Sequence, residues 1–265
     1  MKLAARRRGH ELVGSVPGEG VRTEQCSRTL RRGLDSRWDD PTVSHARATK
    51  SQLLFERFCH DHGLNCRPIP VGPSRTADYR IEVAGHEVVA EVKQLDPNRR
   101  DRAAALAIEA GGVGEFGGEA GSRIRHVIDK GKQQISALAR GRHPGILVVY
   151  NNVLVCPTYT DPMFVMIAMY GHLTVDLELP VAGGGPPKVR QVRHGAKSKV
   201  SATSNTSLSA LCVMTADEAA RVFLAFYHNK FAALRFAADW LRAPEVKHYG
   251  LPNDAGRSVR AWAEI

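Results

Sequence analysis

The chain has 265 residues, 43% of them hydrophobic, so it can bury a substantial core and global disorder is excluded. Lys and Arg outnumber Asp and Glu by 37 to 27, a balance that favours an anionic partner such as nucleic acid. The 5 cysteines are scattered without a CxxC pair, which indicates a reducing compartment rather than a disulfide framework. No apolar run is long enough for a signal peptide or a membrane span, so we expect a cytoplasmic protein without membrane contact.

The first 44 residues are basic, rich in Gly and Ser, and lack sustained periodicity. They predict a flexible leader, or alternatively an arm whose arginine pairs and triplets touch a phosphate backbone. From residue 45 to residue 265 the pattern is that of a single folded domain. Its first element is a predicted helix at 46–62, where apolar residues form one stripe and Gly63 provides a stop. Glu56 borders that stripe.

Two strand-like runs follow within residues 75–95, RTADYRIEVAGHEVVAEVKQL, around a predicted turn at Gly85-His86. Side chains alternate between the two faces of a strand, so Glu91 and Lys93 share one face of the second run. Asp78 enters the first run with the parity opposite to its apolar residues, and pairing of the runs brings it beside Glu91. Two adjacent carboxylates repel each other unless a cation lies between them. The hairpin therefore predicts a site for a hard divalent ion with an ammonium group alongside.

The rest of the chain alternates between predicted helices and predicted strands. The helices are expected at 99–110, 122–140 and 163–170, and the strands at 146–150, 173–179 and 208–214. Residues 222–227 suit either type of element, and residues from 244 onward are expected to form a loose appendage. A hairpin, a helix and then a buried strand indicate an α/β fold with a central mixed β-sheet flanked by helices.

The spacing D-x12-E-x-K, carried by Asp78, Glu91 and Lys93, resembles that of the PD-(D/E)xK nuclease superfamily. Ala77 stands where the family name has proline, a position that holds no metal ligand. The alternative is a chance match on a surface hairpin with a solvated Glu–Lys pair. The resemblance implies a restriction-endonuclease-like core and a Mg²⁺-dependent deoxyribonuclease, with Mn²⁺ as a substitute metal.

The resemblance also implies roles for individual residues. Asp78, Glu91 and the carbonyl of Val92 would hold the ion, and Lys93 would position or deprotonate the attacking water. An acid on the preceding helix, here Glu56, would reach the same ion through water or bind a second one.

The helix at 122–140 would carry a polar side chain towards the phosphate. Gln133 is the chosen candidate, with Gln134 as the alternative. The side chains predicted to bind nucleic acid lie on this helix and in a polar segment, expected to be a mobile basic loop at about 183–206. They are Arg125, Lys130, Lys132, Lys188, Arg190, Arg193, Lys197 and Lys199. A solvated helix face and a disordered insertion are the alternatives for these two regions.

The expected partner is DNA, and a homodimer or a partner protein of a defence or repair system is a further possibility. Two other functions stay open. One is a non-catalytic nucleic-acid-binding module on the same fold, and the other is a nuclease subunit that is active only with its partners.

Overall fold

The computed structural model describes residues 48–70, 76–139, 141–179, 186–252 and 262–265. Contacts between residues divide the chain into two units, Met1–Ala46 and Arg47–Ile265. The predicted basic leader at 1–44 lies outside the described residues. The fold and the candidate site both belong to the second unit.

A large mixed β-sheet forms the centre of this unit, with the strand order β1-β2-β3-β4-β7-β8-β9-β10. Strand β3 pairs in parallel with β4, β4 with β7 and β8 with β9, while the other neighbours are antiparallel. The strands of this sheet are β1 (Asn65–Pro68), β2 (Tyr79–Val83), β3 (His86–Leu95), β4 (Gly145–Asn151), β7 (Leu208–Ala216), β8 (Val222–His228), β9 (Val246–Gly250) and β10 (Ala263–Glu264).

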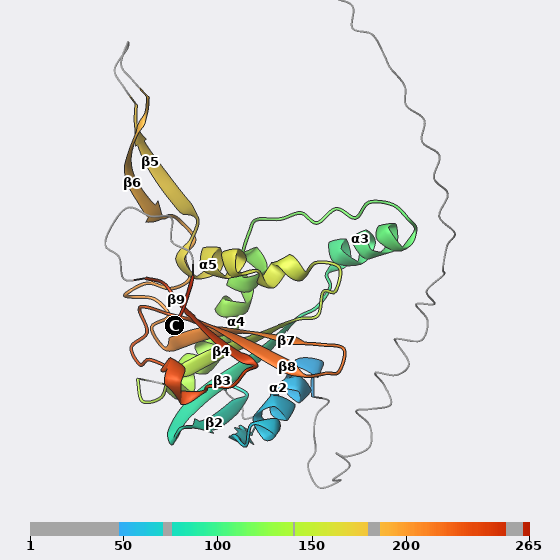
Figure 1. The fold of residues 1–265 in the computed structure, drawn as a ribbon, viewed down its shortest axis with the longest axis vertical. Helices are drawn as coiled ribbons and strands as arrows, with labels where there is room; N and C mark the ends of the chain where they lie inside the picture. The colour runs from blue at the N-terminus through green and yellow to red at the C-terminus, as the bar shows by residue number, and fades with distance from the viewer. Residues whose placement is uncertain (1–47, 71–75, 140, 180–185, 253–261) are drawn as a thin grey trace, which may run out of the picture. The chain divides into compact units, whose positions relative to one another are not determined.

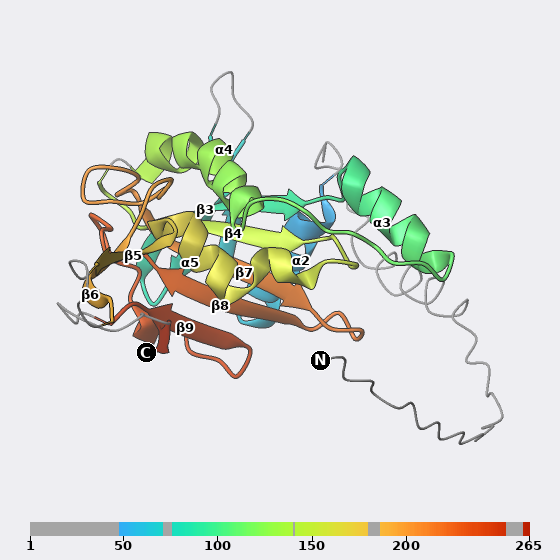
Figure 2. The same cartoon turned by 90° about the horizontal axis from the view of Figure 1, so that it is seen from above.

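Helices cover both faces of the sheet (Figures 1 and 2). Helix α2 (Lys50–Asp61) packs on one face, and helices α4 (Ser122–Ala139) and α5 (Pro162–Tyr170) pack on the other. Helix α3 (Arg99–Glu109) follows β3 beyond the sheet, and a short 3-10 helix, η1 (Pro157–Thr160), follows β4. A second 3-10 helix, η2 (Ala238–Trp240), precedes β9. The predicted α/β class with a mixed sheet flanked by helices is confirmed.

The alternation of apolar side chains explains why the sheet has two cores. Strand β4 is apolar almost throughout and buried over six of its seven residues, as expected for a central parallel strand covered on both sides. Its Ile146 and Val148 contribute to the core beneath α2, whereas Leu147 and Val149 contribute to the core beneath α4 and α5. Each core is therefore formed by every second residue of the same strands.

Local capping signals define the helix that precedes the hairpin. Thr49 accepts a hydrogen bond from the backbone N–H of Gln52, and the Gln52 side chain accepts one from the backbone N–H of Thr49. This capping box begins α2 at Lys50, later than the predicted start at Ala46. Ser51 then donates its backbone N–H to the Gln94 side chain at 3.1 Å, which ties the first turn of α2 to β3.

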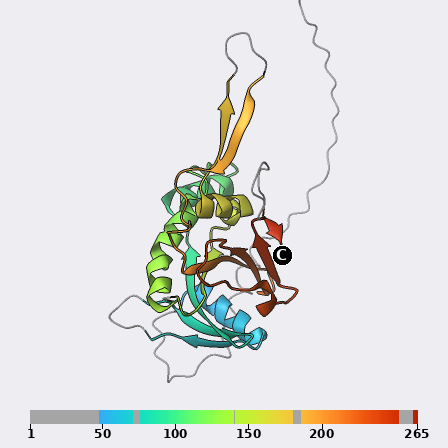
Figure 3. The same ribbon diagram turned by 90° about the vertical axis from the view of Figure 1, so that its left-hand side faces the viewer.

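Two regions differ from the sequence prediction. Residues 188–194, predicted within a mobile loop, form strand β6 (Lys188–His194), which pairs with β5 (Leu173–Glu178) as a separate hairpin (Figure 3). The C-terminal appendage predicted from residue 244 contains β9, because the edge of β8 accepts a further parallel strand. Among the described helices, none is both long and apolar enough to cross a membrane.

Candidate active site

The register of β2 and β3 places Asp78 and Glu91 side by side. Tyr79 pairs with Ala90, so Asp78, one residue before Tyr79, lies opposite Glu91. The turn falls at Ala84-Gly85, one residue earlier than predicted, and both residues have a positive φ of 49° and 77°. The predicted proximity of the two carboxylates is present.

Each carboxylate is oriented by a backbone N–H of the other strand. Glu91 Oε2 accepts from the N–H of Asp78 at 3.1 Å, and Asp78 Oδ2 accepts from the N–H of Val92 at 2.8 Å. These two bonds continue the hairpin by one step beyond its last paired residues. They fix both carboxyl groups without using their remaining oxygens.

Glu91 is fully buried, with 0% of its surface exposed. Burial is the largest cause of its pKa shift and the charge of Asp78 adds to it. Lys93 and the Asp78 backbone N–H act in the opposite direction, and the net effect raises the pKa of Glu91 to about 7. The group therefore changes its charge near neutral pH, as expected of a carboxyl placed for chemistry or for cation binding.

Lys93 lies on the same face of β3, where its ammonium forms an ion pair with Glu91 Oε1. Oε1 is buried, and this ammonium is the group that it contacts among the described residues. The side chain of Lys93 is 26% exposed, so it reaches from the buried carboxylate to solvent. The exposed part of this side chain presents a positive charge to solvent.

The main chain supplies a third oxygen at the same point. Strand β2 pairs with β3 only as far as Ala90, so Val92 has no β2 partner. The N–H and C=O of one strand residue point towards the same neighbour. Since the N–H of Val92 donates to Asp78, its carbonyl also faces the Asp78 side.

Helix α4 covers the carboxylate face of β3 closely because it has a glycine at the contact. A Cβ atom added to Gly131 would lie 2.8 Å from Leu147 Cδ1 and 3.4 Å from Glu91 Cγ. A larger residue would hold the helix away from Glu91. Glycine has a low intrinsic helix propensity, but at this position its small size lets α4 complete the burial of the Glu91 carboxyl group.

One glutamine of α4 reaches the hairpin. Gln134 donates from Nε2 to the carbonyl of Thr76 at 3.0 Å, two residues before Asp78. Gln133, the preferred sequence candidate, is exposed. Adjacent helical residues point in directions about 100° apart, and only one of the two can face the strands.

Glu56 lies in different surroundings from the two paired carboxylates. Its Oε1 accepts a hydrogen bond from the Tyr79 hydroxyl at 2.7 Å. Tyr79 belongs to the core beneath α2, on the opposite face of the sheet from α4. Among the described side chains, no hydrogen bond or ion pair joins Glu56 to Asp78 or Glu91, the two predicted cation ligands.

Sequence reasoning missed the contribution of Gln52. Its Nε2 donates to Asp78 Oδ1 at 3.3 Å, so the same side chain that caps α2 also contacts the site. The sequence signal that points to Gln52 is the Thr-x-x-Gln capping box, whose glutamine lies four residues before Glu56 on the same helix.

The predicted nucleic-acid contacts fall into different environments. Arg125 is only 6% exposed and donates to the Ala120 carbonyl, which makes it part of the interior. Lys132 and Lys199 both pair with Asp129, at 3.1 and 2.5 Å. Lys197 pairs with Glu119 at 2.9 Å. The remaining four lie on the exposed surface of α4 or in the backbone of β6: Lys130, Lys188, Arg190 and Arg193.

The donor set at the hairpin fits a hard divalent cation. Two carboxylates and a main-chain carbonyl are the oxygen ligands that Mg²⁺ accepts, and it commonly keeps several waters besides. The buried Oε1 of Glu91, which pairs with Lys93, is an oxygen that such an ion would also contact. Among the described residues there is no group of three or more His, Cys, Asp or Glu side chains suited to a metal. The site therefore offers fewer protein ligands than a closed metal cage.

Comparison of the chain with protein-family models, with curated proteins and with solved structures finds no match.

Proposed function

We propose that the chain is a metal-dependent nuclease that hydrolyses phosphodiester bonds of DNA at the Asp78–Glu91–Lys93 site. The observation that carries the proposal is the fully buried Glu91, held beside Asp78 and Lys93 with a pKa raised to about 7. A buried carboxylate beside a second, half-buried carboxylate destabilises a fold unless a cation offsets the charge. The order of helix α2, the β2–β3 hairpin, helix α4 and parallel strand β4 suits the restriction-endonuclease-like core that we propose with it.

In this proposal Asp78, Glu91 and the carbonyl of Val92 hold one Mg²⁺. When bound, the ion lowers the pKa of a coordinated water and stabilises negative charge on the phosphate. The hydrogen bonds from Asp78 N–H and Val92 N–H keep the two carboxylates in place for binding. Ionised Glu91 is required, so cation binding displaces its proton.

Lys93 has two roles in this proposal. A cation held by Asp78 and Glu91 would weaken the ion pair between Glu91 and Lys93, and the Lys93 ammonium would then act on the solvent side, where its side chain is 26% exposed. There it donates hydrogen bonds to a phosphate oxygen and positions the attacking water. Water adds to phosphorus and gives up a proton to solvent, one P–O ester bond breaks, and the leaving oxygen takes a proton from solvent.

The experiment is cleavage of supercoiled plasmid and of single-stranded DNA with Mg²⁺, with Mn²⁺ and with EDTA. We expect metal-dependent nicking that is reduced by about a thousandfold or more in Lys93→Ala, since electrostatic transition-state contacts are worth that much. DNA binding by the variant should persist. Lys247→Ala is the matched control, because this exposed lysine on β9 also pairs with a glutamate but lies outside the site.

Equal cleavage by wild type and Lys93→Ala would refute the assignment of the site. Metal-independent DNA binding without turnover under any condition would favour the non-catalytic binding module. Activity that emerges only in the presence of another protein would favour the partner-dependent subunit.

A further inference from the structure

A cavity of about 480 Å³ opens beyond the C-terminal ends of β3 and β4, away from the carboxylate pair. Its walls are the first turn of α3, the glycine-rich segment before α4, the 3-10 helix η1 and the start of α5. In open α/β sheets the carboxyl ends of parallel strands are where ligands bind. The volume is within the range of small-molecule sites, which is about 300 to 1,000 Å³.

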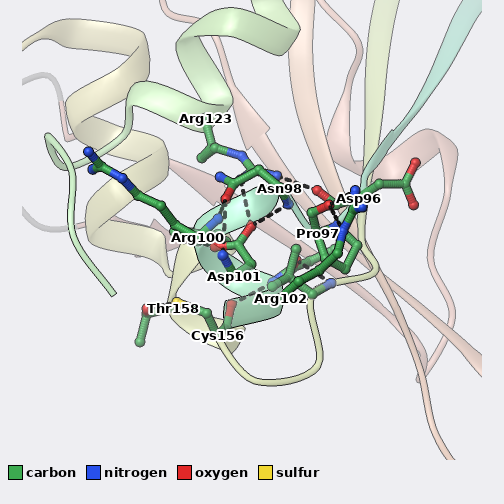
Figure 4. A network of polar contacts seen from close by, with 12 residues as sticks. Asp96, Pro97, Asn98, Arg100, Asp101, Arg102, Arg123, Cys156 and Thr158 are labelled. Carbon is green, nitrogen blue, oxygen red and sulfur yellow. Dashed lines mark hydrogen bonds and ion pairs between the residues drawn. The ribbon is translucent and has the colours of Figure 1, made fainter. Parts of the chain in front are cut away.

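A buried polar network joins three of the residues that line this cavity, Asn98, Arg123 and Tyr159. Asp101, 1% exposed, accepts from Arg123 Nη1 at 2.8 Å and from the Tyr159 hydroxyl at 2.6 Å. It also accepts from the backbone N–H of Asn98 at 2.8 Å, as part of the cap of α3. Figure 4 shows Arg123 at the start of α4 beside Asn98 and Asp101 at the start of α3. Burial alone would raise the pKa of Asp101, but the hydrogen bonds from Tyr159, Asn98 and Arg123 hold it below its usual value.

Two arginines line the cavity without a partner of their own. Arg99 and Arg100 are exposed, and among the described residues neither side chain has a hydrogen bond or an ion pair. The Arg100 side chain extends away from the Asp101 network in Figure 4. The guanidinium group of Arg100 can therefore pair with a ligand, whereas that of Arg123 is already paired with Asp101.

The one lining carboxylate is already neutralised. Glu119 accepts from Lys197 at 2.9 Å and pairs with His172 at 2.8 Å, and Arg125 lies 3.1 Å away. The hydrogen bonds from Lys197 and His172 are the main reason that its pKa is lowered to about 2. The cavity as a whole thus attracts an anion.

The same cavity presents aromatic surface. Phe116, Tyr159 and Phe164 line it from the glycine-rich segment, η1 and α5. Aromatic rings bind nucleobases by stacking, and arginine binds phosphate through paired donors. A ligand that joins a flat ring to a phosphate uses both features together.

We propose that this cavity binds a single nucleotide unit, with its phosphate on Arg99 and Arg100 and its base against Phe116 and Phe164. The unit is either a free mononucleotide or an unpaired nucleotide of a strand, and the chemistry of recognition is shared. The inference does not depend on the carboxylate pair being catalytic. It adds a binding site at the end of β3 opposite to the hairpin turn.

The test is a binding titration in EDTA with adenosine monophosphate, with inorganic phosphate and with a short single-stranded oligodeoxyadenylate. Work in EDTA keeps the result separate from any nuclease activity. We expect Arg99→Ala/Arg100→Ala to weaken nucleotide binding by about tenfold or more, since charge-assisted hydrogen bonds are lost. Arg102→Ala/Arg242→Ala removes the same charge outside the lining of the cavity and should bind as the wild type does.

Phe116→Ala distinguishes a nucleotide site from a plain anion site. It should weaken binding of adenosine monophosphate and of the oligonucleotide, and leave binding of inorganic phosphate unchanged. Monophosphate binding at least as tight as oligonucleotide binding would identify a free nucleotide. Tighter oligonucleotide binding that is lost on removal of the terminal base would identify an unpaired unit of a strand.

The proposal is overturned if neither nucleotide probe binds. It is also overturned if the arginine double variant, with an unchanged melting temperature, binds as tightly as its control. Equal affinity for phosphate and for adenosine monophosphate would overturn the assignment of the base.

Discussion

Replacement of Glu91 by glutamine should change how the stability of the chain depends on pH. The wild-type carboxyl is buried, and its pKa is raised from 4.5 to about 7, mainly by burial and then by Asp78. Glutamine has nearly the same shape and can still accept the N–H of Asp78 through its amide oxygen. It cannot ionise, so the substitution isolates the effect of the charge.

The sign follows from the number of protons that each state binds. Between the two pKa values the folded chain holds a proton on Glu91 that the unfolded chain has released, so the free energy of unfolding falls as pH rises. This contribution is fully present below pH 4.5 and is lost as pH rises through about 7. At about 1.4 kcal/mol for each pKa unit, the total loss is about 3 kcal/mol.

The assay is denaturant unfolding in EDTA at about pH 5 and about pH 8 for wild type and for Glu91→Gln. Relative to the wild type, the variant should gain about 2 to 3 kcal/mol between the two pH values. Glu82→Gln is the control, because Glu82 is an exposed glutamate on the adjacent strand β2. It removes a charge of the same sign outside the buried site, so the effect specific to Glu91 is the difference between the two variants.

A Glu91→Gln variant whose stability differs from the wild type by the same amount at both pH values would refute this reasoning. That result would mean that Glu91 ionises at an ordinary pKa. The case for a carboxylate placed to bind a cation would then lose its main support.

Two further predictions follow from the arrangement of the other titratable groups. Glu56→Gln should reduce Mn²⁺ affinity far less than Asp78→Asn in a calorimetric titration, because Glu56 is held by Tyr79 in the α2 core; equal losses in both variants would show that Glu56 serves the ion. His228 has a pKa lowered to about 4 by burial and by His248, so its contribution to stability should fall by about 3 kcal/mol as pH drops from 6.5 towards 4. Glu91 changes the stability in the opposite direction over much of this pH range. The effect of His228 is therefore measured as the difference in unfolding free energy between His228→Gln and the wild type at each pH. A difference that does not change with pH would contradict the prediction.

The part of the site that sequence predicts is the part that strand geometry dictates. Alternation puts Asp78 and Glu91 on one face of the hairpin, and the turn at Ala84-Gly85 sets the register that places them opposite each other. Lys93 shares the face of Glu91 for the same reason. These positions needed no knowledge of the tertiary contacts.

Helical side chains were harder to place because packing decides which way a helix is rotated. Gln134 rather than Gln133 faces the hairpin, a difference of one residue that periodicity does not resolve. Glu56 borders the apolar stripe of α2, and such a residue lies at the edge of the buried face, where a neighbour such as Tyr79 determines its contact.

Strands β6 and β9 escaped prediction because their pairing comes from neighbours rather than from their own composition. Strand β6 is polar and basic, and it is ordered by pairing with β5. Strand β9 follows a 3-10 helix and adds to the free edge of β8. In both cases a distant segment supplies the hydrogen bonds, and a single sequence carries little signal of that.

The most direct test of the account is a Mn²⁺ titration of wild type and Asp78→Asn at about pH 8, with proton release measured in buffers of different ionisation enthalpy. The account predicts one bound ion for the wild type, release of a proton when the titration is repeated at about pH 6.5, and loss of binding in the variant. An ion that binds equally well to Asp78→Asn, or no binding at all, would contradict the assignment of Asp78 and Glu91 as a cation site.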